Sequence, residues 1–129
     1  MRYKQEAVGK TLKAVVTLGA REGYNGKKEY SLEEVIAKLN EVNAEFQREK
    51  VQPINCMISQ AQLVGRSGDT NYQEKLYILD FACSPRIAVP SKFFFLKAAK
   101  EYAFRLAEKM KQERVYLEFK GDTYVFKRE

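Results

Sequence analysis

The order in which the hydrophobic period changes along the chain is the feature that most limits its fold. Some stretches place apolar side chains at every second position, which is the period of a strand. Two others repeat them every three or four positions, which is the period of a helix. In chain order these are strand 11–20, a helix that starts at Ser31 and ends before Pro53, strands 54–65 and 72–83 joined by a loop over 65–71, helix 90–113, and strands 115–119 and 123–127.

This order is that of a ferredoxin-like β-α-β-β-α-β plait with one extra C-terminal strand. In such a plait the first and third strands are central, and here 11–20 and 72–83 are the most continuously apolar strands, as central strands should be. We therefore expect an α+β fold with two helices on one face of a mainly antiparallel sheet. Residues 1–10 are a polar lead-in, and 11–129 form a single domain of ordinary size.

Charge and composition limit the classes of function. The chain has 129 residues, a formal net charge of +6 and no histidine. The positive charge favours anionic partners. The lack of histidine removes the commonest general base and the commonest metal ligand. We therefore expect no metal site and no cofactor, and we lean against an enzyme.

The cysteines and the N-terminal residues bear on the compartment. Cys56 and Cys83 fall close to opposite one another on the second and third strands, so a cross-strand disulfide and two free thiols are both conceivable. Free thiols are preferred, because cytosolic thiols stay reduced. Residues 1–10 lack the apolar core of a signal peptide, and no run reaches transmembrane length. We expect a cytoplasmic protein without a membrane partner.

The loop at 21–30 is the first candidate site. It joins a strand end to a helix N-terminus, where backbone N–H groups attract anions. The simpler interpretation is a plain connection with turn glycines. Our leading hypothesis is a small oligomeric protein that binds an anionic ligand, a nucleotide or a phosphorylated metabolite, without turnover. Its ligand-binding residues would be Arg21, Gly23, Tyr24, Gly26, Lys27, Lys28 and Ser31.

One face of the second predicted helix mixes aromatic and basic side chains, as nucleic-acid surfaces do. The alternative hypothesis is therefore a nucleic-acid-binding protein. Glu101 and Glu108 lie on the same flank and weaken the positive field, which favours a protein interface or packing under the terminal hairpin. The residues of this face are Phe93, Lys97, Lys100, Phe104 and Lys111.

Asp80 is a weak catalytic candidate, because it lies between Leu79 and Phe81 on a predicted central strand. A carboxylate in such a place can serve as an acid or a base, which gives a third hypothesis, a small hydrolase or isomerase. More often such a group faces outward or pairs with a lysine, here Lys13.

The sheet face opposite the helices is the last candidate surface. It would carry apolar side chains among polar ones, and an open apolar face usually meets a partner. A second copy of the same chain is the simplest partner, so we expect a homo-oligomer. The predicted face consists of Lys13, Val15, Thr17, Leu76, Ile78, Asp80 and Ala82.

Overall fold

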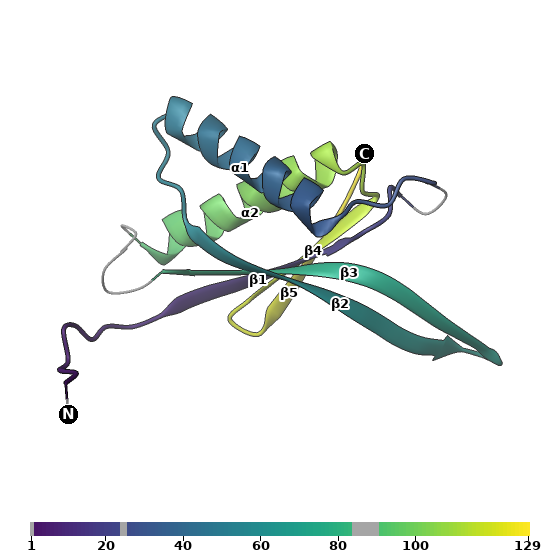
Figure 1. Cartoon of the computed structure of the whole chain (residues 1–129), viewed down its shortest axis with the longest axis horizontal. Coiled ribbons are helices and arrows are strands. Elements are labelled where there is room, and N and C mark those ends of the chain that lie inside the picture. The colour runs from purple at the N-terminus through teal and green to yellow at the C-terminus, as the bar shows by residue number, and fades with distance from the viewer. Residues whose placement is uncertain (1, 24–25, 84–90) are drawn as a thin grey trace.

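The structure, a computed structural model, describes residues 2–23, 26–83 and 91–129. Two helices lie on one side of a five-stranded sheet (Figure 1). The predicted order of elements is confirmed. The elements are β1 (Leu12–Gly19), α1 (Leu32–Arg48), β2 (Asn55–Ser67), β3 (Thr70–Cys83), α2 (Lys92–Lys109), β4 (Arg114–Phe119) and β5 (Asp122–Lys127).

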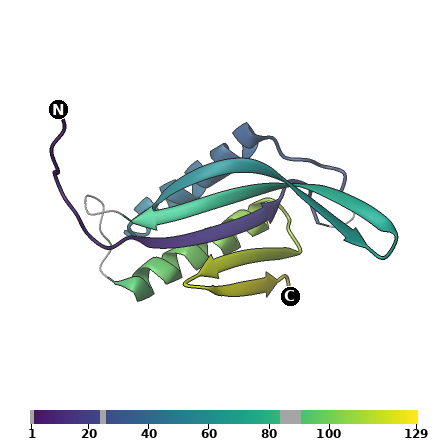
Figure 2. The same ribbon diagram turned by 90° about the horizontal axis from the view of Figure 1, so that it is seen from below.

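The sheet has the strand order β2-β3-β1-β4-β5, and every neighbouring pair is antiparallel. β1 and β3 lie in the interior, as predicted for the plait, and β5 is the extra strand beyond β4. Figure 2 shows the sheet from the side away from the helices. The α+β class and the placement of both helices on one face are thus confirmed.

The core lies between this sheet and the two helices. Along β1 the side chains of Ala14, Val16 and Leu18 are at most 1% exposed, while the intervening residues face the other side. From the helices, Phe46 and Tyr102 pack with ring centroids 4.4 Å apart. Burying such aromatic side chains is a major source of stability.

Capping residues set where α1 begins and where α2 ends. The Ser31 hydroxyl accepts from Glu34 N–H at 3.2 Å and the Glu34 carboxylate accepts from Ser31 N–H at 3.1 Å, which is the predicted capping box. α2 ends at Lys109, earlier than predicted, because the chain turns left-handed at Lys111 (φ 53°). There Lys111 N–H bonds to Glu108 O and Gln112 N–H to Ala107 O, a Schellman motif. The predicted start at Pro90 lies outside the described residues.

The β2–β3 hairpin is longer than predicted. We expected a loop over 65–71, but Ser67 pairs with Thr70, so the turn is only Gly68 and Asp69. Gly68 adopts φ 59°, which a glycine reaches without strain. β1 pairs with β3 only as far as Leu76, so residues 62–75 form a two-stranded extension, which we call the hairpin arm. It projects beyond the helices in Figure 1.

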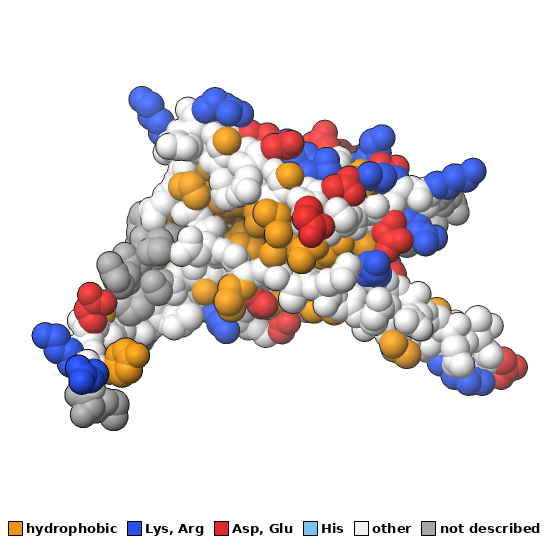
Figure 3. All heavy atoms as spheres, in the orientation of Figure 1, with side chains coloured by type: hydrophobic (Ala, Val, Ile, Leu, Met, Phe, Trp, Pro, Cys, Tyr) orange, Lys and Arg blue, Asp and Glu red, His pale blue; other side chains and the backbone are white. Residues whose placement is uncertain are grey.

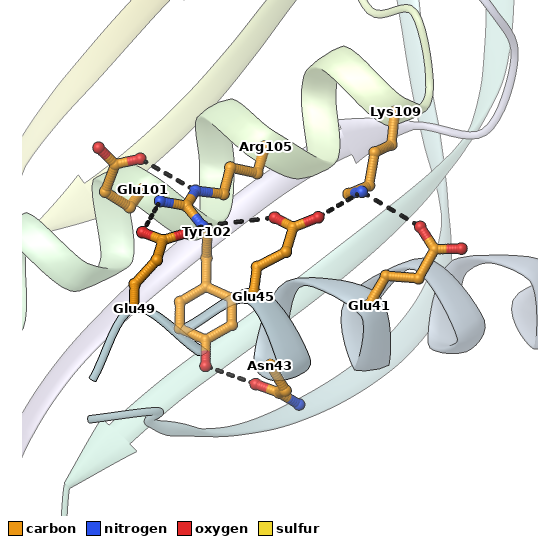
Figure 4. A network of polar contacts seen from close by, with 8 residues as sticks. All are labelled: Glu41, Asn43, Glu45, Glu49, Glu101, Tyr102, Arg105 and Lys109. Carbon is orange, nitrogen blue, oxygen red and sulfur yellow. Dashed lines mark hydrogen bonds and ion pairs between the residues drawn. The ribbon is translucent and has the colours of Figure 1, made fainter. Parts of the chain in front are cut away.

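An ion-pair network joins the two helices on their outer side (Figure 4). The Arg105 guanidinium lies 2.8 Å from the Glu49 carboxylate and 3.3 Å from that of Glu45. The Lys109 ammonium lies 2.8 Å from Glu45 and 3.2 Å from Glu41. The hydrogen bond from Lys109 is the largest cause that holds the pKa of Glu45 below its usual value. These charges are paired with one another, so the network holds the two helices together.

Both cysteines are free, as preferred from the sequence. Cys56 lies opposite Phe81, and Cys83 lies two residues further along β3. None of the helices in the described part of the chain is long and apolar enough to cross a membrane.

Candidate functional site

β1 and β4 separate at one end of the sheet. Their pairing runs from Ala14 opposite Phe119 to Thr17 opposite Tyr116 and stops there. β1 nevertheless continues to Gly19, where it still pairs with β3. The β1 end and the start of β4 therefore form the two sides of a split within the sheet.

A pocket of about 290 Å³ occupies this split, and we call it the split pocket. It opens on the face away from the helices, because Thr17, Leu76 and Tyr116 alternate with the buried Leu18, Tyr77 and Leu117. Its lining residues are Thr17, Gly19, Arg21, Gly23, Leu63, Glu74, Leu76, Gln112, Glu113, Arg114 and Tyr116.

A second pocket of about 360 Å³ adjoins the first beside the hairpin arm, and we call it the arm pocket. Arg21, Gly23 and Glu74 line both pockets, so a cation and a carboxylate stand between them. The remaining wall of the arm pocket consists of Ala20, Glu29, Tyr72, Gln73 and Lys75. The two pockets are therefore contiguous, with Arg21 and Glu74 at their boundary.

Gly19 and Gln112 shape the floor of the split pocket. A Cβ atom on Gly19 would lie 3.0 Å from Gln112 Oε1 and 3.3 Å from Glu74 Oε1, so both polar groups occupy the space that a side chain would fill. Gly19 N–H donates to Gln112 Oε1 at 3.0 Å. Gln112 is 7% exposed, and among the described residues it is the one buried residue with an amide or charged side chain. The sequence signal was Gly19 itself, since a glycine within a strand often marks a close approach.

The loop that begins at Arg21 closes on itself. Glu22 N–H donates to Lys28 O at 2.9 Å, and Tyr30 N–H donates to Ala20 O at 2.7 Å. The Tyr30 hydroxyl donates to the Glu22 carboxylate at 2.8 Å. Burial and this acceptor raise the pKa of Tyr30 to about 12, so the hydroxyl remains a donor at neutral pH. These bonds anchor both ends of the loop beside the pocket.

Of the predicted ligand-binding residues that the structure describes, two, Arg21 and Gly23, line the split pocket and the arm pocket. Lys28 is 2.7 Å from the Glu34 carboxylate, and Ser31 caps α1 together with Glu34. That carboxylate makes the α1 N-terminus less attractive to an anion. Gly26 packs on the Glu22 backbone, where its Cβ would lie 1.9 Å from a carbonyl oxygen. Lys27 is exposed, and Tyr24 lies outside the described residues.

The aromatic and basic face of α2 divides between packing and exposure. Phe104 packs edge to face on Phe126 at 4.7 Å, and the Lys100 ammonium lies 4.7 Å from the Tyr124 ring. These contacts are the packing under the terminal hairpin that the sequence favoured. Phe93 remains 76% exposed. Lys97 lines a hollow beside α1, and Lys111 lies beyond the helix, 3.9 Å from the Glu22 carboxylate.

Asp80 lies three residues before the end of β3, opposite Val15 and Met57, on the sheet face away from the helices. It is not among the residues that line the split pocket or the arm pocket. The carboxylate that reaches both pockets is Glu74, which sequence reasoning did not single out. Its strand was predicted, but the split beside it depends on where β1 and β4 stop pairing.

A further hollow of about 340 Å³ lies between α1 and the edge strand β2. Figure 3 shows hydrophobic side chains gathered between the helices and the sheet. The one thiol in its lining is that of Cys56, and burial, followed by the nearby Asp80 charge, raises its pKa to about 12. A protonated thiol is a poor nucleophile, so Cys56 does not supply this hollow with a reactive group.

No protein-family model matches the sequence, and no curated protein matches it either. Among solved structures, a phage SAM lyase in complex with S-methyl-5′-thioadenosine has a TM-score of 0.67 at 19% identity, over 98% of this chain and 97% of the other. A phage SAM lyase in the apo state has a TM-score of 0.64 at 20% identity, over 98% of each chain. These likenesses show that the fold is shared along almost the whole chain.

Proposed function

We propose that this chain binds an adenosine-containing small molecule of the S-adenosylmethionine (SAM) class and cleaves it to S-methyl-5′-thioadenosine. The observation that carries the proposal is the likeness, over 98% of this chain, to a phage SAM lyase that holds S-methyl-5′-thioadenosine. The split pocket and the arm pocket are the site that we assign to the ligand. Free thiols fit a reducing compartment, so we place the reaction in the cytoplasm.

The chemistry of the two pockets suits such a ligand. SAM carries a sulfonium and an ammonium cation together with a carboxylate. In the proposal the adenine lies in the split pocket against Tyr116 and Leu76, because flat rings gain from stacking and apolar contact. The methionine part extends into the arm pocket. Arg21, between the pockets, binds its carboxylate, and Glu74 attracts the cations.

The cleavage needs neither water nor an oxidant. The bond between the sulfonium sulfur and the γ-carbon of the methionine chain breaks, and its electron pair moves to sulfur, giving the neutral thioether. An oxygen of the substrate's own carboxylate bonds to the same carbon and closes a five-membered lactone. The protein's part is to hold the carboxylate close to that carbon, since correct orientation alone can supply much of the acceleration. Glu74 holds the neutral thioether less strongly than the cation, which favours product release.

A second candidate is the binding of a nucleotide or phosphorylated metabolite without turnover. It is favoured by the position of Arg21 and Gly23 in the pocket and by the net charge of +6. The two candidates differ in ligand charge. The first needs Glu74 to attract a cation, whereas an anion would be repelled by it.

The test combines binding and turnover. The purified protein is incubated with SAM, and S-methyl-5′-thioadenosine is measured by liquid chromatography, while thermal shifts are recorded with both compounds and a panel of nucleotides. Glu74→Gln should lower SAM affinity roughly tenfold to a hundredfold, as expected for a lost charged contact. Glu118→Gln, on the same sheet face but outside the pocket lining, is the matched control and should behave like the parent.

Each outcome decides between the candidates. A parent protein that neither releases S-methyl-5′-thioadenosine nor is stabilised by it or by SAM would refute the leading proposal. Stabilisation by nucleotides alone would favour the second candidate. Stabilisation by SAM without formation of S-methyl-5′-thioadenosine would support the binding part of the proposal and refute the cleavage part.

A further inference from the structure

The Gln112 side chain stands where the β1–β4 ladder ends. The last β1–β4 pair is Thr17 with Tyr116, and two residues further along β1 the Gly19 N–H donates to Gln112 Oε1 at 3.0 Å. A side-chain amide thus takes up the backbone donor at the β1 end. This keeps a buried polar group satisfied while the two strands diverge.

The other end of the same amide holds the start of the loop. Gln112 Nε2 donates to Arg21 O at 2.8 Å and to Met110 O at 3.2 Å. The amide therefore connects the β1 end, the first residue of the loop and the C-terminal cap of α2. These contacts join residues 91 and 93 positions apart in sequence. They require an acceptor and two donors on one planar group, which among side chains only an amide of this length supplies here.

The end of α2 sets the position of this amide. The left-handed turn at Lys111 reverses the chain, and Gln112 N–H bonds to Ala107 O at 2.8 Å. The next residues, Glu113 and Arg114, then form the other wall of the split pocket. One residue thus contacts both sides of the split, which is the geometry needed to fix its width.

We propose that Gln112 is a positioning residue that fixes the width of the split pocket and the place of Arg21, and so sets how tightly the site holds the methionine carboxylate of its ligand. This inference rests on the proposed function. It adds a residue whose effect is transmitted through the backbone of Gly19 and Arg21 and not by direct contact with the reacting atoms.

Two substitutions separate the two ends of the amide. Gln112→Met keeps the length of the side chain and removes all three of its side-chain hydrogen bonds. Gln112→Glu keeps the acceptor for Gly19 N–H but has no donor for Arg21 O when ionised. Gln60→Met is the matched control, because Gln60 donates to the Tyr77 hydroxyl at 3.2 Å and lines neither pocket.

The first readout is amide hydrogen exchange of Gly19, measured by NMR without ligand. Gln112→Met should speed this exchange about fivefold or more, which corresponds to one lost hydrogen bond. Gln112→Glu should leave it near that of the parent. Unchanged exchange in Gln112→Met would overturn the inference whatever the ligand proves to be. Where Gln112→Met does not fold, Gln112→Asn, which is too short to reach both partners, takes its place in the same measurement.

The second readout is the split between KM and kcat for SAM. Both Gln112 variants should raise KM about fivefold to tenfold and change kcat less, since they loosen carboxylate binding. Gln60→Met should change neither constant. Parent-like KM in both variants, with faster Gly19 exchange in Gln112→Met, would show that Gln112 only supports the fold and would overturn the positioning role. A parent without SAM turnover or binding refutes the proposed function, and the Gly19 exchange still tests the structural half independently.

Discussion

The hydroxyl of Tyr102 should contribute measurably to the stability of the fold, in addition to the packing of its ring in the core. The ring is fully buried, with centroids 4.4 Å from Phe46 and 4.8 Å from Phe81. The hydroxyl donates to Asn43 Oδ1 at 2.5 Å and accepts from Ile54 N–H at 3.3 Å. Burial is the main cause that raises the pKa of Tyr102 to about 12, so it remains a donor at neutral pH. Tyr102→Phe therefore removes two hydrogen bonds without disturbing the packing.

The expected loss follows from the group left without a partner. Ile54 is 4% exposed, so its N–H has little access to water, and an unsatisfied buried donor costs about 1–3 kcal/mol. Asn43 lines the hollow between α1 and β2, where water can replace the lost bond, so its share is small. We expect the free energy of unfolding to fall by about 1–3 kcal/mol, or roughly 3–5 °C of melting temperature per kcal/mol for a chain of this size.

Urea denaturation monitored by circular dichroism measures this loss. Tyr3→Phe is the matched control, since Tyr3 is 89% exposed and should change stability by less than about 0.5 kcal/mol. In a double-mutant cycle with Asn43→Ala, the coupling energy should reach about 0.5 kcal/mol or more. A Tyr102→Phe protein as stable as the Tyr3→Phe control would contradict the assigned hydrogen bonds.

Three further predictions concern acid, assembly and nucleic acid. The pKa of Glu45 is lowered in the folded state, so its contribution to stability is present above the unfolded pKa of about 4.3 and is lost as pH falls through the folded value. Denaturation measured from pH 7 to pH 3 should show this loss. Lys109→Met should make the free energy of unfolding depend less on pH over the same range. We propose that copies of the chain meet through the sheet face away from the helices, with Val15 near the centre of the interface and the split pocket left open at its edge. Val15→Lys should therefore give a monomer or an insoluble protein, and a parent that is monomeric in light scattering at high concentration would reject this. If α2 binds nucleic acid, an oligonucleotide should be retarded at about 50 mM salt and released at higher salt; replacing Lys97 and Lys100 by Glu should abolish the shift, and no shift by the parent would end that hypothesis.

Most of the topology was predictable because it follows from where apolar residues recur. The alternation along β1 and the helical periods of α1 and α2 determine which side of each element is buried. The capping box at Ser31 and Glu34 is a local signal and was read correctly. Such features depend on residues close in sequence, so a single chain is enough to identify them.

The candidate site was less predictable, because it depends on where pairing stops. Nothing local to β1 or β4 shows that their ladder ends at Thr17 and Tyr116. Residues 65–71 read as a loop because glycine and polar residues dominate them, yet their backbone pairs almost to the turn. Gln112 follows a left-handed lysine where a helix more often has glycine, so the sequence did not indicate the turn that buries its amide.

The hairpin arm gives the site two walls of unequal stiffness. At the base of the arm, Ala20 N–H donates to Lys75 O at 3.1 Å and Lys75 forms an ion pair with Glu29. Beyond this base, the two described strands of the arm form a ladder only with each other, and a lone two-stranded ribbon is marginally stable in water. The opposite wall, formed by the β1 end and Gln112, is tied to the core. Native proteins open locally where few buried contacts oppose the motion, so the arm should fluctuate independently of global unfolding. Glu74 and Tyr72 belong to the arm and move with it. A ligand that contacts them would therefore bind first against the fixed wall at the β1 end, and the arm would become ordered around it.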